Sequence, residues 1–269
     1  MTPEKRFLVD VGMNNLPFPI RVASRIHPDG QFTIANISIN AHIMHMFEAQ
    51  WIDKFIHILH QHREIIGTKT LRTNIMDYVR EFDKAPVKVD FEYPFFIEKR
   101  TPVSKEKCLV RYLCKYSAKA SAVQEPKILF TIDIPIITTY PKSSIILTER
   151  PFGQLSIVSI TVESKEEVYP EDIVEIVDKH ALSPVYSYLT PEDQDYVIRT
   201  IHQGDKSSVI TVDEIKDELA HDRKIDWYSV RSSNFGMLHS YSTVIATEKS
   251  SWIPFSDLSE ELDREGGLL

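Results

Sequence analysis

The sequence predicts an α+β fold in which antiparallel sheet predominates. Several segments of strand length carry apolar residues at alternate positions, and segments between them carry apolar residues at helical spacing. The order is strands, two helices and strands, and a similar order then follows again. Glycine is scarce, with 8 residues, and most of the 15 prolines fall between the periodic segments, which marks the limits of the elements.

The first half is predicted to contain two helices between strands. Residues 32–40 alternate imperfectly and are typical of a strand. Residues 47–66 have helical spacing, and Gly67 is expected to end that helix, as a glycine commonly does. A second helix is expected at 71–82. Three strands are then predicted, at 87–97, 108–116 and 128–137.

The second half is predicted to repeat this arrangement. A strand is expected at residues 155–162, and Pro170 is expected to open a helix that runs to Ala181. Thr211 with Glu214 forms a capping-box pattern for another helix, which reaches about His221. Two closing strands are predicted, at 226–230 and 237–246, before an acidic tail at 251–269.

Composition excludes two classes of partner. The formal net charge is −8 without a long basic run, which argues against a nucleic-acid partner. No apolar stretch approaches the roughly 18 residues of a membrane span, and no secretion signal is recognisable, so we expect a cytoplasmic protein. Cys108 and Cys114 lie about 20 Å apart in one predicted strand, too far for a disulfide, and are expected to be reduced.

Five short signatures occur in order along the chain, and together they resemble a known family. They lie at residues 10–20, 95–104, 140–155, 183–194 and 222–239. Over residues 9 to 247 the chain resembles the zinc-dependent type IB GTP cyclohydrolases, which convert GTP to 7,8-dihydroneopterin triphosphate and formate. In that family a bound zinc makes the attacking water nucleophilic near pH 7.

The resemblance implies a tunnelling fold, or T-fold, in which sheets of antiparallel strands carry paired helices. It implies one bimodular chain over 1–269, with an N-terminal module at about 9–140 and a C-terminal module at about 141–250. It also implies a homotetramer whose pockets lie between subunits and bind a small-molecule ligand.

The resemblance puts unusual residues at the zinc positions. The signatures in question are Tyr140-Pro141-Lys142-Ser143, Pro151-Phe152-Gly153-Gln154-Leu155 and Asn234-Phe235-Gly236-Met237-Leu238-His239. Tyr140 stands where the family has a metal cysteine, Phe152 where it has a metal histidine, and Gln194 where it has a metal glutamate. Only the last histidine is kept, as His239. Phenylalanine cannot bind a metal, and neutral tyrosine or an amide binds zinc poorly, so no metal and no cofactor are expected.

Four further positions depart from the family. Lys142 stands for a second cysteine, and Gly236 stands for the acid/base glutamate. Leu155 stands for an arginine, and Ser144 stands for another basic residue, which predicts weaker handling of phosphate.

Each candidate catalytic residue carries two interpretations. Lys142 is a reactive amine if its pocket is apolar, because desolvation lowers the pKa of a lysine, and otherwise a solvated side chain. His239 is a general acid/base with Tyr140 or Tyr241 nearby, or else a hydrogen-bonded core histidine.

Two other groups of residues also carry two interpretations. His57, His60 and His62 with Glu64 indicate either a metal cluster or a solvated helix face. Asp213 and Glu214 lie close to where T-fold enzymes place the carboxylate that anchors a purine or pterin, and a capping role explains Glu214 equally well.

Three functions follow as hypotheses. The first is a repurposed enzyme that acts without zinc on a non-GTP aromatic or heterocyclic substrate, in a pocket made apolar by Trp51, Tyr140, Phe152 and Leu155. The second is a non-catalytic paralogue that binds a ligand or stabilises an assembly. The third is a GTP cyclohydrolase with an altered site. A catalytic protein should place Lys142, His239 or Tyr140 together in a closed pocket, whereas a structural protein should have filled the pocket.

Overall fold

The computed structural model describes residues 8–44, 51–82, 84–140, 152–236 and 240–249. The strands are β1 (Leu8–Val22), β2 (Gln31–Met44), β3 (Val87–Arg100), β4 (Lys107–Ala120), β5 (Lys127–Thr139), β6 (Gly153–Ser164), β7 (Ser183–Pro184), β8 (Ile225–Phe235) and β9 (Thr243–Glu248). The helices are α1 (Trp51–Gln61), α2 (Thr68–Glu81), α3 (Pro170–His180), α4 (Pro191–Gln203) and α5 (Ser208–His221).

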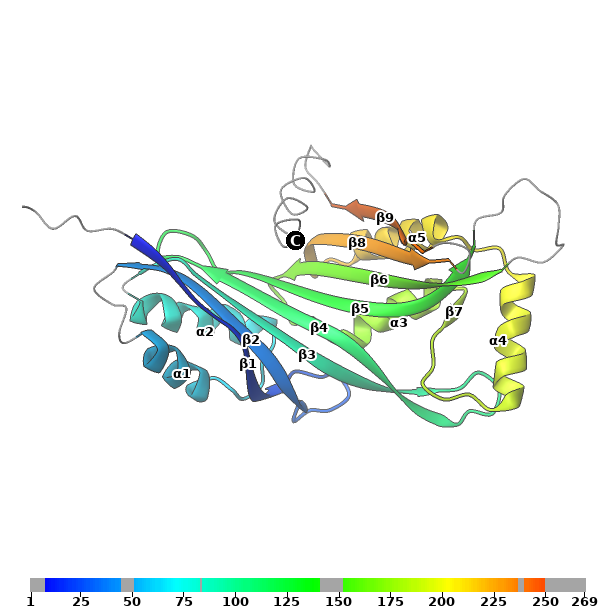
Figure 1. Ribbon diagram of the computed structural model, residues 1–269, viewed down its shortest axis with the longest axis horizontal. Coiled ribbons are helices and arrows are strands. Elements are labelled where there is room, and N and C mark those ends of the chain that lie inside the picture. Colours follow the sequence, from blue (N-terminus) through cyan, green and yellow to red (C-terminus); the bar gives the residue numbers. More distant parts are fainter. Residues whose placement is uncertain (1–7, 45–50, 83, 141–151, 237–239, 250–269) are drawn as a thin grey trace, which may run out of the picture.

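The described strands form one antiparallel sheet, in the order β1-β2-β3-β4-β5-β6-β8-β9, with β7 paired to β5. Helices α1, α2, α3 and α5 pack against one face of this sheet, and α4 stands across one end of it (Figure 1). The predicted α+β fold with predominant antiparallel sheet is therefore confirmed. No helix in the described ranges is long and apolar enough to cross a membrane.

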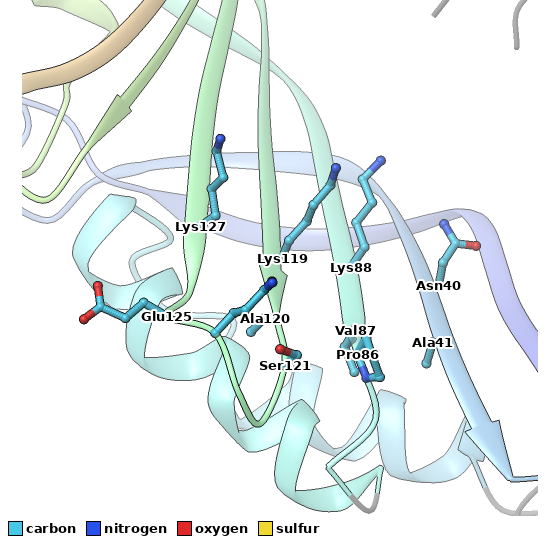
Figure 2. A pocket seen from close by; sticks show the side chains of 11 residues that line it. Asn40, Ala41, Pro86, Val87, Lys88, Lys119, Ala120, Ser121, Glu125 and Lys127 are labelled. Atoms are coloured by element: carbon cyan, nitrogen blue, oxygen red, sulfur yellow. The ribbon is translucent and has the colours of Figure 1, made fainter. Parts of the chain in front are cut away.

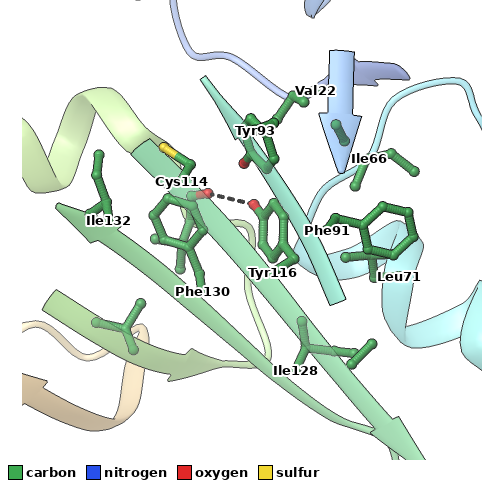
Figure 3. Packing of buried hydrophobic residues seen from close by; sticks show 14 of the residues in the cluster. Val22, Ile66, Leu71, Phe91, Tyr93, Cys114, Tyr116, Ile128, Phe130 and Ile132 are labelled. Carbon is green, nitrogen blue, oxygen red and sulfur yellow. Dashed lines mark hydrogen bonds between the residues drawn. The ribbon is translucent and has the colours of Figure 1, made fainter. Parts of the chain in front are cut away.

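The core follows from the alternation of buried residues along the strands. In β3 and β4 every second side chain is buried on the helix face, as the period of two requires. The largest of them meet at the centre of the sheet, where the ring of Tyr116 lies 4.9 Å from that of Phe130 and 6.2 Å from that of Tyr93 (Figure 3). The hydroxyl of Tyr116 donates to the carbonyl of Val168, 3.4 Å away, and so ties the segment before α3 to the sheet.

The element order repeats once along the sheet. Strands β1 to β4 enclose α1 and α2, and strands β5 to β9 enclose α3, α4 and α5. The two sets meet where β4 pairs with β5, from Leu113 and Asp133 to Lys119 and Lys127. The sheet is continuous across this junction, and the module boundary expected near residue 140 stays a prediction.

The expected role of Gly67 is wrong. Helix α1 ends at Gln61, because the chain then turns back to pair with the end of β1: the Ile66 amide donates to the Arg21 carbonyl at 2.6 Å. Gly67 is instead the residue that precedes α2, with an extended φ of −161°. The apolar spacing of residues 62–66 is typical of a helix, and it contains no signal of this long-range pairing.

The expected capping box at Thr211 is also wrong. Helix α5 begins at Ser208, and the Ser207 side chain caps it by accepting from the Ile210 amide. Thr211 lies inside the first turn and donates to the Ser207 carbonyl at 3.1 Å.

Both cysteines are free and buried, as expected. The start of the last predicted strand, at 237–239, and the tail at 251–269 lie outside the described residues.

The N-terminus of α2 is capped by a residue from the second half of the chain. The Glu167 carboxylate accepts from the amides of Thr68, at 2.7 Å, and Lys69, at 3.2 Å. It satisfies two amides that have no partner within the helix, and its negative charge favours the positive end of the helix dipole. A Cβ atom at Gly67 would collide with this carboxylate, which explains the glycine at that position.

We expect Glu167→Ala to lower the free energy of unfolding by about 1 kcal/mol, because α2 loses its cap. Glu166→Ala is the matched control, since the Glu166 side chain makes an exposed ion pair with Lys69. Urea unfolding of both variants measures the difference. Equal midpoints for the two variants would show that the Glu167 contact does not support α2.

Candidate functional site

The candidate site lies at the end of the sheet where β5 finishes and β6 begins. Thr139 pairs with Gly153, and just beyond them the Tyr140 amide donates to the Phe152 carbonyl at 2.7 Å. The antiparallel pairing thus brings two of the sequence signatures together. The intervening residues 141–151, which include Lys142, are not among those described.

The third signature reaches the same place through β8. Leu155 pairs with Phe235 across β6 and β8, and Gly236 follows at the end of β8. A Cβ atom built on Gly236 would lie 2.5 Å from Cε2 of Tyr140. The tyrosine ring therefore occupies the space that any larger side chain at position 236 needs.

A layer of buried polar side chains supports this end of the sheet. Ser156 donates to Oδ1 of Asn234 at 2.8 Å and lies 2.8 Å from the hydroxyl of Thr138. Gln154 donates to the Thr138 hydroxyl at 3.2 Å. All four side chains are buried. Because buried polar groups are stable only when paired, this layer holds the three strands in one register.

A pocket of about 360 Å³ opens between this edge and α4. Its wall is largely apolar and includes two expected residues, Phe152 and Leu155, each more than two fifths exposed. Helix α4 supplies Ile198, Ile201 and His202. The volume is within the range of small-molecule sites. Phe152 and Leu155, two of the residues expected to make an apolar pocket, line it, while Trp51 is buried in the core at the start of α1.

His202 is a pocket residue that the sequence analysis missed. Among the described residues of the pocket wall, His202 alone carries an imidazole, which can accept or donate a proton. The signal that predicts its helix was available, because Thr190, Pro191 and Asp193 form a capping box with proline at the first helical position. A helix beginning there carries Ile198, Ile201 and His202 toward the strand edge.

Asp193 fixes the position of α4. Its carboxylate is fully buried and accepts hydrogen bonds from the amides of Val103 and Ser104, at 2.8 and 3.0 Å. It also accepts from the hydroxyls of Ser104, at 2.6 Å, and Thr190, at 2.7 Å. Burial alone raises the pKa of Asp193, but these hydrogen bonds outweigh it and lower the pKa. The turn between β3 and β4 thereby anchors the helix that forms the pocket wall (Figure 1).

The other expected site residues are not all gathered at the pocket. Gln194 is exposed at the start of α4 and donates to the Leu189 carbonyl at 3.3 Å. Tyr241 is exposed near the start of β9. His239, like Lys142, lies outside the described residues, so the roles expected for both stay predictions.

The histidines around α1 do not converge. His57 contacts Gln61 at 2.9 Å, His60 packs edge-on against the Phe18 ring, and His62 contacts Asp77 at 2.7 Å. His62 and Glu64 also lie beyond the end of α1. Within the ranges that the structure covers, no group of three or more His, Cys, Asp or Glu residues is arranged to hold a metal ion.

Asp213 and Glu214 make ion pairs on the surface of α5. Asp213 contacts Lys216 at 2.5 Å, and Glu214 contacts Lys206 at 2.5 Å and His180 at 3.1 Å. The hydrogen bond from Lys206 holds the pKa of Glu214 below its usual range. The Thr139 amide donates to the Lys206 carbonyl at 2.8 Å, and the Lys206 amide donates to the Thr139 hydroxyl at 2.8 Å, so this cluster supports the end of β5.

Comparison with known proteins relates the whole described fold to one family. The sequence model described as "Type I GTP cyclohydrolase folE2" matches residues 3–245. GTP cyclohydrolase FolE2 of Geotalea uraniireducens is 30% identical over 239 residues, which cover 89% of this chain and 87% of the relative. GTP cyclohydrolase FolE2 of Dictyoglomus turgidum is 30% identical over 254 residues, which cover 92% and 94%.

Two solved structures share the fold at low sequence identity. Uricase from Arthrobacter globiformis has a TM-score of 0.52 at 9% identity, with 94% of this chain and 98% of that chain covered. Urate oxidase from Bacillus sp. TB-90 has a TM-score of 0.55 at 10% identity, with 91% and 100% covered. Urate oxidase is a tunnelling-fold protein with two T-fold modules, so the expected T-fold is confirmed.

We expect Asp193→Asn to lower the melting temperature by several degrees at pH 7, because the amide presents a donor to the donors of Ser104 and Thr190. The pKa of Asp193 is lowered by folding, so its stabilisation is complete above the unfolded-state pKa of about 3.9 and is lost as the pH falls further. The gap between wild type and variant should therefore stay constant from pH 7 to about 4 and narrow below it.

Melting curves between pH 2 and pH 7 test this dependence. Asp195→Asn serves as the control, because Asp195 lies on the same helix with an exposed ion pair to Arg199. A gap that widens in acid would contradict the assigned ionisation of Asp193.

Proposed function

Because this chain belongs to the family described as Type I GTP cyclohydrolase folE2, we propose that it acts on a guanine nucleotide in the pocket between the β5–β6 edge and α4, as a GTP cyclohydrolase with an altered site. The match through residues 3–245 supports the substrate class. The position of the pocket supports the site, because two family signatures, at Tyr140 and Phe152, meet at its edge.

The proposal includes the loss of the family's zinc set. Phe152 has no lone pair for a metal, and Gln194 turns its amide toward the Leu189 carbonyl. The Tyr140 ring packs against Gly236. These residues do not fit a catalytic zinc, which is usually held by three protein ligands of the His, Cys or carboxylate type. The proposed reaction therefore has no step that uses zinc at these positions.

The side chains that are kept and those that are changed differ in burial. Gln154 and Asn234, which belong to the family signatures but are not among the changed positions, lie in the buried polar layer. Phe152 and Leu155, which replace a histidine and an arginine, are exposed at the pocket. This contrast supports an altered reaction centre on a maintained scaffold, because the changes fall where a ligand makes contact.

In the proposed reaction His202 transfers the proton. Its imidazole lines the pocket and can both accept and donate a proton, as an acid/base group must. Ile198 and Ile201, which lie four residues and one residue before His202 on α4, line the pocket together with Leu155 and hold the plane of a heterocycle. Substrate phosphates then extend toward the rim, since the described wall offers them no cation.

A second candidate is the repurposed, zinc-independent enzyme that acts on a non-GTP aromatic or heterocyclic substrate. The contact between Tyr140 and Gly236 favours it, because the tyrosine ring fills the space of the family's acid/base glutamate. A purely structural paralogue is less well supported, because the pocket is open rather than filled.

We also propose that the protein assembles as a homotetramer with pockets at subunit interfaces. Leu155, Phe235 and Val244 leave apolar surface exposed on neighbouring strands beside the pocket. Exposed apolar surface of this kind is typical of interaction sites. Sedimentation equilibrium should give four times the mass of one chain, and a monomer at micromolar concentration would contradict the assembly.

A turnover assay distinguishes the two candidate functions. The purified chain is incubated with GTP while formate release and bound metal are both measured. The altered-site cyclohydrolase should release formate, and His202→Gln should lower kcat by about 100-fold or more, as expected for the loss of a general acid/base. His221→Gln is the matched control, because His221 is exposed on α5 and bonds only to the Asp217 carbonyl.

Formate release with stoichiometric zinc would overturn the proposed loss of the zinc set. Failure to turn over GTP, together with tighter binding of purines or pterins that lack phosphate, would overturn the first candidate and support the second. Equal kcat for His202→Gln and wild type would remove His202 from the reaction.

A further inference from the structure

A row of three lysines crosses the sheet at the end far from the candidate site. Lys119 of β4 pairs in register with Lys88 of β3 on one side and with Lys127 of β5 on the other. Figure 2 shows the three side chains extending from the same side of the sheet. Like charges directly opposite each other destabilise a sheet, and this chain has a formal net charge of −8. Neither sheet stability nor composition accounts for the row.

These lysines line a second pocket of about 360 Å³. It is bounded by the turn between β4 and β5, which contributes Ser121 and Glu125, and by Asn40 of β2. The Ser121 hydroxyl is buried and has no hydrogen-bond partner among the described residues. A buried hydroxyl without a partner is unfavourable, so this atom is suited to a ligand that enters the pocket.

The charges in the pocket wall favour an anion. Lys88 is partly balanced by Asp90, at 2.9 Å, and Lys127 by Glu163, at 3.3 Å. Lys119 makes no ion pair with another described residue and stands between the other two lysines. Glu125 is the one acidic residue in the pocket wall, against three lysines.

We propose that this pocket binds a small molecule carrying a chain of two or three phosphates. Lys119 is the central ligand, Lys88 and Lys127 flank it, and the Ser121 hydroxyl donates to a phosphate oxygen. The outer lysines are two strand spacings apart, about 10 Å, a span that a single phosphate does not bridge. Ammonium groups and hydroxyl donors are the usual partners of phosphate oxygens.

This site is separate from the pocket at α4. Lys127 begins β5 and Thr139 ends it, so the two sites lie about 40 Å apart along one strand. One ligand cannot occupy both within a single chain. Whether the lysine-lined pocket binds phosphate therefore does not depend on the proposed cyclohydrolase activity.

Calorimetric titration of the full chain with tripolyphosphate tests the proposal, at constant ionic strength set with sodium chloride. Lys119→Gln should weaken binding by about tenfold, the effect of losing one charged hydrogen bond, and Ser121→Ala should weaken it several-fold. Lys107→Gln is the matched control, because Lys107 lies on the same strand at its other end, paired with Glu98. Its affinity should equal that of the wild type.

Two further measurements keep the result interpretable. Without phosphate, Lys119→Gln should be at least as stable as wild type, because it relieves repulsion along the row. Titration with ATP identifies the source of the phosphates: equal affinity indicates recognition of the phosphate chain alone, and tighter binding indicates a nucleotide.

Four results would overturn the site. They are no heat of binding, equal binding by wild type and Ser121→Ala, equal binding by wild type and Lys119→Gln, and loss of tripolyphosphate binding in His202→Gln. The last result would mean that tripolyphosphate occupies the pocket at α4 instead.

Discussion

The pairing of β5 with β6 is the constraint on which the rest of the structure depends. It runs without interruption from Leu129 and Glu163 to Thr139 and Gly153, within the second half of the sheet, and it forms the edge at which the candidate site lies. A slip of one residue would turn every side chain of β6 to the opposite face. Ser156 would leave the buried polar layer, and Leu155 would leave the pocket and enter the core. Fold and site are therefore determined by the same register.

Local patterns predict the strands well because one face of the sheet is buried throughout. The alternation in β3, β4 and β5 is a direct record of that burial; β4 and β5 extend beyond the predicted limits at both ends, and β3 extends beyond its predicted end. Helix limits were less predictable where partners are distant in sequence. Ile66 lies beyond the end of α1 and pairs with Arg21, and Gly67 makes room for the Glu167 carboxylate. Neither of these contacts can be recognised from the local sequence pattern. Ser207 is the N-cap residue of α5, and since serine and threonine are both favoured at that position, the local sequence does not distinguish Ser207 from Thr211.

The candidate site was predictable to the extent that motifs mark it. The signatures at Tyr140, Phe152 and Gly236 do meet in space, because adjacent strands end together. His202 was not predictable in the same way, since a single histidine on an amphipathic helix has no characteristic spacing. Its place in the pocket follows from Asp193, whose hydrogen bonds to the β3–β4 turn orient α4. The buried Asp193 carboxylate, which is not part of the pocket wall, thus decides which residues of α4 meet the strand edge.

The cap that Glu167 provides to α2 has a consequence for how the chain holds together. The first helix pair relies on a carboxylate that follows it by four strands in the sequence, so the first half has no complete set of helix partners by itself. Tyr116 adds a second tie of the same kind through the Val168 carbonyl. Local opening of the segment before α3 therefore weakens both halves at once, and the chain is expected to unfold as one cooperative unit despite its internal repetition. Duplicated halves of this kind cannot be exchanged or truncated independently of each other.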